Sequence, residues 1–117
     1  MSNKPFSMGF RVVFYREHDR VIAHALEFDL IGDGENREEA LKRLSTAITI
    51  QVEFAMQSSD PATALFRQAP PEIMAMFASG QALVEGVLKI SVEEDGWQFS
   101  GEEFRDADVQ DRELACV

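Results

Sequence analysis

Two apolar runs separated by a polar break open the chain. Residues 10–16 (FRVVFYR) and 21–26 (VIAHAL) are rich in β-branched and aromatic side chains, which favour extended structure. The polar segment 17–20 (EHDR) lies between them. The pattern therefore predicts a β-hairpin.

Both faces of the first strand of this hairpin are apolar. Successive side chains of a strand point to opposite faces, so Phe10, Val12 and Phe14 share one face. Val13 and Tyr15 share the other. One face is expected to take a helix, and the other needs a second helix or another subunit.

A capped amphipathic helix is predicted next. Residues 28–34 (FDLIGDG) suffice only for a stub of a third strand and a turn, in which Gly32 and Gly34 are able to take positive φ. Asn36 is a favoured N-cap, and Glu39 three residues later completes a variant of the capping box. The predicted buried stripe consists of Leu41, Leu44, Ile48, Val52 and Ala55. Ile50 and Phe54 lie off this stripe, and we expect them to pack within the chain rather than against a partner.

The second half of the chain predicts two short helices. Asp60 and Pro61 are suited to the N-cap and first position of one helix, and residues 72–78 form another that ends at Gly80. Strands are then expected in the C-terminal third, over residues 87–92 and 97–100 around a turn at 94–96, before a fraying acidic tail. We expect one domain over residues 1–117, with the hairpin, turn and main helix at 10–57, a helical insertion at 58–84, C-terminal strands at 86–100 and a tail at 102–117.

Charge and cysteine content narrow the classes of function. The chain has 21 acidic and 11 basic residues and a net charge of -10, which disfavours direct nucleic-acid binding. Its single cysteine, Cys116, permits neither an internal disulfide nor a cysteine zinc site. The sequence shows neither a signal-peptide pattern nor an apolar run of membrane-spanning length, so we expect a cytoplasmic protein without membrane contact.

Three segments resemble the N-terminal domain of HicB-family antitoxins: 21–26 (VIAHAL), the turn 32–36 (GDGEN) and the helix start 37–41 (REEAL). The resemblance implies an α+β fold with a small β-β-β-α-β core, described as partial ribonuclease H-like, here with a helical insertion before the last strands. The chain departs from the family in residues 26–30 (LEFDL), where the usual proline is missing. The acidic tail has only Arg105 and Arg112 as basic residues, so the DNA-binding function of family C-terminal domains is not carried over.

The resemblance also implies a non-catalytic module that covers a small basic toxin, a HicA-like messenger-RNA interferase. The acidic charge would steer and complement such a partner. The candidate partner contacts are Glu27, Asp29, Asp33 and Glu35, with a solvated loop as the competing interpretation. The alternative function is a homo-oligomeric structural or small-ligand-binding module, in which the second face of the sheet pairs in a homodimer.

Catalysis has little support in the residues. Ribonuclease H chemistry needs carboxylates that converge on metal ions, and the first strand, residues 10–15, has none. His24 is expected to be a packed strand residue and His18 a solvated one. The spacing of Asp29, Asp33 and Glu35 lacks the calcium-loop pattern, so we expect no enzyme, no metal site and no cofactor.

Overall fold

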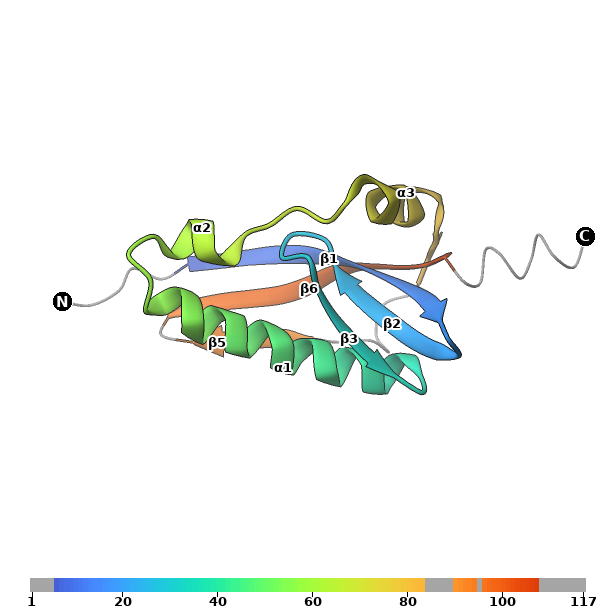
Figure 1. Ribbon diagram of the computed structural model, residues 1–117, viewed down its shortest axis with the longest axis horizontal. Coiled ribbons are helices and arrows are strands. Elements are labelled where there is room, and N and C mark those ends of the chain that lie inside the picture. Colours follow the sequence, from blue (N-terminus) through green and yellow to red (C-terminus); the bar gives the residue numbers. More distant parts are fainter. Residues whose placement is uncertain (1–5, 84–89, 95, 108–117) are drawn as a thin grey trace, which may run out of the picture.

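A computed structural model describes residues 6–83, 90–94 and 96–107. These residues form one mixed six-stranded sheet and three helices (Figure 1). The strands are β1 (Phe6–Glu17), β2 (Arg20–Ala25), β3 (Leu30–Gly34), β4 (Gln81–Ala82), β5 (Ser91–Glu94) and β6 (Trp97–Asp106). The helices are α1 (Arg37–Met56), α2 (Pro61–Leu65) and α3 (Pro71–Ser79).

The order of strands defines a β-β-β-α-β core. The sheet runs β3-β2-β1-β6-β4, and β5 also pairs with β6. β1 and β6 are parallel, whereas the remaining pairs are antiparallel. The predicted α+β class is confirmed, and α2 and α3 occupy the expected insertion between α1 and the last strands.

The hairpin is closed by the tightest common connection. Glu17 pairs with Arg20, so only His18 and Asp19 form the loop. Both have positive φ, 52° and 65°, as a type I′ turn requires. Histidine and aspartate enter this left-handed region more readily than bulkier residues, which explains how the turn forms without glycine.

Gly32 and Gly34 serve a purpose other than the predicted one. They lie within β3 and do not adopt positive φ, so the expectation of a glycine turn was wrong. A Cβ on Gly32 would overlap the backbone of Ala40 and Leu44, and a Cβ on Gly34 would lie 2.8 Å from the Ala40 nitrogen. The glycines therefore allow α1 to approach β3 closely.

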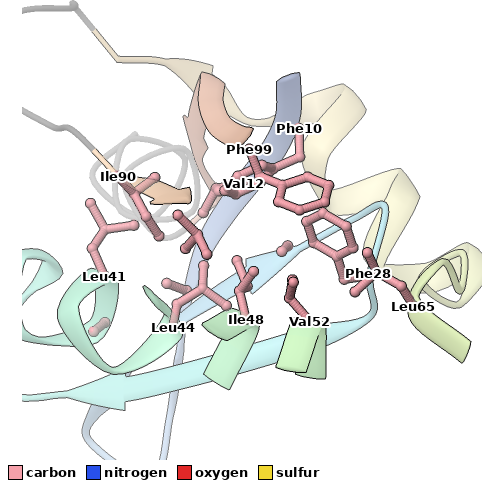
Figure 2. Close-up of a cluster of buried hydrophobic side chains, with 14 of the residues drawn as sticks. Phe10, Val12, Phe28, Leu41, Leu44, Ile48, Val52, Leu65, Ile90 and Phe99 are labelled. Carbon is pink, nitrogen blue, oxygen red and sulfur yellow. The ribbon is translucent and has the colours of Figure 1, made fainter. Parts of the chain in front are cut away.

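The main core lies between α1 and one face of the sheet. All five residues of the predicted stripe are buried, together with Ala40. Figure 2 shows Leu44, Ile48 and Val52 pointing from α1 toward the strands, with Phe10, Phe28 and Phe99 at one end of the cluster. The ring of Phe28 lies 5.3 Å from that of Phe10 and 5.5 Å from that of Phe99. The side-chain alternation of β1 thus places Phe10, Val12 and Phe14 as expected.

A second helix covers part of the opposite face, as one of the two expected arrangements. A smaller cluster joins the sheet to α3 and its flanking residues: Val13, Leu26, Ala69, Ile73, Phe77 and Ala107. The Phe77 ring lies 4.6 Å from the guanidinium carbon of Arg105 and 5.5 Å from that of Arg11. Such cation–π contacts and the bonds from Arg105 Nη1 to the carbonyls of Phe77 and Ala78 hold α3 against β1 and β6.

Three further expectations change in the structure. Ile50 and Phe54 are 60% and 63% exposed, so the expectation that they pack within the chain was wrong. β6 continues to Asp106, so the first residues of the expected fraying tail belong to the sheet. Residues 87–89 of the strand predicted over 87–92 lie outside the described residues. In the described part of this strand, Ile90 and Val92 are buried as predicted.

Candidate functional site

The four predicted contact carboxylates do not form one cluster. Glu27 and Asp29 lie in the connection between β2 and β3, whereas Asp33 and Glu35 lie at the opposite end of β3. Asp33 lies four positions after Asp29, which corresponds to about 13 Å along an extended strand. The structure therefore divides the predicted site into two pairs at opposite ends of one strand.

Three of these four side chains bind cationic or imidazole groups of the same chain. Glu27 accepts hydrogen bonds from the backbone N–H of Arg11 at 2.8 Å and from its Nε at 2.7 Å. Asp33 accepts one from Arg20 Nε at 3.0 Å, and Asp29 lies 2.7 Å from His24 Nε2. These pairs offset part of the negative charge that a basic partner would meet.

Glu35 is exposed and lies at the start of α1. Its backbone N–H donates to Glu39 Oε1 at 2.7 Å, while the Asn36 side chain accepts from the Glu39 N–H at 2.8 Å. The capping-box variant is thus confirmed, with Glu39 reaching one residue beyond the N-cap. The backbone of Glu35 is thus held by a hydrogen bond, and the residue is exposed to solvent.

A partly buried row of three hydrogen-bonded side chains is the main polar feature that the sequence did not reveal. Tyr15 Oη lies 2.8 Å from His24 Nδ1, and His24 Nε2 lies 2.7 Å from Asp29 Oδ1. His24 is only 7% exposed, which confirms the expected packed position. Asp29 adopts a positive φ of 53°, a conformation that aspartate tolerates better than most residues.

The Asp29 carboxylate assigns the direction of the hydrogen bonds, because its oxygen can only accept from His24 Nε2. Burial, followed by the charges of Glu17 and Asp29, raises the pKa of Tyr15 from 10.0 to about 12. The phenol keeps its proton and donates it to His24 Nδ1, which is the acceptor nitrogen when the imidazole proton is on Nε2. His24 then carries its proton on Nε2 and donates to Asp29 when the imidazole is neutral.

These three side chains have the hydroxyl–imidazole–carboxylate order of nucleophilic triads, with a tyrosine in the hydroxyl position. Burial favours the neutral form of the Tyr15 phenol and raises its pKa. The contacts connect β1, β2 and the β2–β3 connection. The arrangement is suited to holding Asp29, and with it the backbone of the β2–β3 connection, in a fixed position.

The hairpin register brings other carboxylates beside Asp33 and Glu35. Glu17 pairs with Arg20, and Gly34 pairs with Val21, so the hairpin loop and the end of β3 share one end of the sheet. We call this surface the acidic end, defined by Glu17, Asp19, Asp33 and Glu35. All but Asp33 are exposed. The sequence contained a signal for Glu17 and Asp19, because a two-residue hairpin places its loop next to the neighbouring strand end.

Two further features, a metal-ligand group and a membrane-spanning helix, are not found in the part of the chain that the structure describes. Over these residues, no group of three or more histidine, cysteine, aspartate or glutamate side chains is arranged to hold a metal ion. Within the same ranges, none of the helices combines the length and apolar character needed to cross a membrane.

Comparisons with known proteins give no further assignment. No protein-family model matches the chain, and no curated protein or solved structure matches it.

Proposed function

We propose that the chain is a non-catalytic protein-binding module, similar to HicB antitoxins, that captures a small basic protein. The partner class is a HicA-like messenger-RNA interferase. The observation that carries the proposal is the acidic end, where Glu17, Asp19 and Glu35 are exposed in a chain of net charge -10. Such a surface attracts a cationic protein and orients it during encounter.

The order of elements supports the same proposal. The strands β1, β2 and β3, then α1, then β6 parallel to β1 follow the β-β-β-α-β order that the HicB resemblance implies. A shared order of elements bears on fold more than on function, so the charge of the surface remains the principal support.

The distribution of carboxylates supports a role without catalysis. Along β1 the sole carboxylate is that of Glu17, exposed at the end of the strand. A two-metal nuclease site needs several carboxylates that converge on the same ions. Asp29, in the β2–β3 connection, and Asp33, on β3, are engaged by His24 and Arg20 instead.

Titration calorimetry with a small basic toxin-like protein encoded beside this chain tests the proposal. We expect stoichiometric binding that weakens as salt is raised, because exposed charges are screened. The double variant Glu17→Lys, Glu35→Lys should weaken binding at least tenfold.

A matched control separates the acidic end from net charge. Glu72→Lys, Glu93→Lys changes the total charge equally at two exposed positions on α3 and β5. Equal weakening by both double variants would remove the acidic end from the proposal. A neighbouring gene product that does not bind, or the lack of any such gene, would argue against toxin capture itself.

A further inference from the structure

The outward side of α1 exposes the two most exposed large hydrophobic side chains among the described residues. Ile50 and Phe54 are 60% and 63% exposed, compared with 48% for Ile31 and 38% for Phe6. Residues four apart in a helix are neighbours on its surface, so Ile50 and Phe54 form one continuous apolar patch. We call the outer face of α1 the surface made by Glu38, Lys42, Arg43, Thr46, Ile50, Glu53 and Phe54, all exposed.

The packing of the chain leaves this patch accessible. The opposite side of α1 is buried against the sheet, and α2 lies near its C-terminal half (Figure 1). Gln51, next to Ile50 in sequence, donates through Nε2 to the Ala64 carbonyl at 2.9 Å. α2 is therefore bound beside the patch and does not cover Ile50 or Phe54.

The charge of the outer face differs from that of the whole chain. The chain has a net charge of -10, whereas this face has two acidic residues, Glu38 and Glu53, and two basic ones, Lys42 and Arg43. Two copies of an acidic chain repel each other least where their surfaces are locally neutral. A second copy of this chain therefore meets less electrostatic repulsion at the outer face of α1 than at the acidic end.

The order of charges along α1 also selects an orientation. Lys42 and Arg43 precede the apolar patch, and Glu53 lies ten residues after Arg43, about 15 Å along the helix. In a parallel pair, like charges would face each other. In an antiparallel pair centred near residue 48, Arg43 of each copy faces Glu53 of the other, and Ile50 faces Thr46. The helix dipoles are also opposed in this arrangement.

We propose that the outer face of α1 is a homodimer interface in which two copies pack α1 against α1 in antiparallel orientation. Ile50 packs on Thr46 of the second copy, Phe54 packs on the aliphatic stem of its Lys42, and the Arg43–Glu53 pairs set the orientation. The interface is separate from the acidic end and does not depend on capture of a basic partner. It also differs from a dimer through the second face of the sheet, where α3 packs.

Sedimentation equilibrium of the full chain over a range of concentrations tests the dimer. We expect reversible, concentration-dependent dimerisation, and Ile50→Ser and Phe54→Ser should each weaken it at least tenfold. Ile31→Ser is the matched control, since it removes a similar exposed side chain from β3 and should leave association unchanged. Helical circular dichroism verifies that each variant remains folded.

A charge exchange tests the orientation. Arg43→Glu and Glu53→Arg should each weaken the dimer, and the double variant should restore it, because the exchanged pair again joins opposite charges across the interface. A chain that stays monomeric at every concentration overturns the proposal, including when another protein binds this face. A dimer unaffected by Ile50→Ser and Phe54→Ser also overturns it, and failure of the double variant to restore association overturns the antiparallel orientation.

Discussion

At the scale of single residues, polar side chains in this protein act through partners that are remote in sequence. His24 lies in an apolar strand, and burial of an imidazole is favourable only if its nitrogens are hydrogen-bonded. Tyr15, nine residues earlier, and Asp29, five residues later, meet this requirement. The same holds for Glu27 and Asp33, which bind Arg11 and Arg20.

The titration of Tyr15 is directly measurable, because it is the only tyrosine of the chain. Phenolate absorbance should show a midpoint near pH 12 in the folded protein and near 10.0 in denaturant. Since the unfolded chain releases this proton first, the free energy of unfolding should decrease as pH rises from about 10 to 12. Tyr15→Phe should remove this contribution, and a folded-state midpoint near 10 would contradict the buried hydrogen bond.

At the scale of elements, the contact between α1 and β3 depends on a lack of side chains. Gly32 lies under the backbone of Ala40 and Leu44, and Gly34 lies under Glu39 and Ala40. The helix starts only three residues after β3 ends, so it folds back directly onto this strand. A larger residue on β3 would lift α1 from the sheet and open the core around Leu44.

We expect Gly32→Ala to lower the free energy of unfolding by about 3 kcal/mol, because backbone atoms cannot move aside for the added methyl group. The Cβ would lie 2.7 Å from the Leu44 Cα and closer still to two other backbone atoms. Chemical denaturation measures the change. Gly80→Ala is the control, since its Cβ would lie 3.0 Å from the nearest atom and should cost much less. Equal losses would show that the close approach is not the cause.

At the scale of the whole molecule, an ion pair joins the start of α1 to the end of β6. Arg37, at the first turn of α1, binds Asp106 at the end of β6, 69 residues later. Asp106 is 3% exposed, and the Arg37 guanidinium carbon lies 5.8 Å from the Phe14 ring. The pair connects α1 with the parallel pairing of β1 and β6. These two strands are the farthest apart in sequence of all paired strands in the described sheet.

A double-mutant cycle on this pair tests its contribution. Arg37→Ala and Asp106→Ala should each lower the free energy of unfolding by about 2 kcal/mol, as for other hydrogen bonds between charged groups. The double variant should lose less than the sum, with a coupling energy of at least about 1 kcal/mol. The more accessible pair Arg20–Asp33, in which both side chains are partly exposed, is the control and should show a coupling below about 1 kcal/mol. Additive effects at Arg37 and Asp106 would show that the two side chains act independently.

The sequence by itself determined the elements whose causes are local. The hairpin, the Asn36 cap and the buried stripe of α1 depend on residues within one or two turns or on simple alternation, and each was predicted. The α+β class, which the family resemblance implied, agrees with these elements and their order. The sequence named the four candidate contact residues, but their division into two pairs follows from the length of β3, which only the structure shows.

Only the tertiary structure decided how distant residues meet. The parallel pairing of β1 with β6, the burial of Asp106 and the Tyr15–His24–Asp29 chain require strand registers that local patterns do not specify. The same is true of the surface: a helical pattern shows that Ile50 and Phe54 share a side, but only the positions of α2 and α3 show that this side remains exposed. Burial is a property of the assembled chain, because each side chain is covered by elements from elsewhere in the sequence.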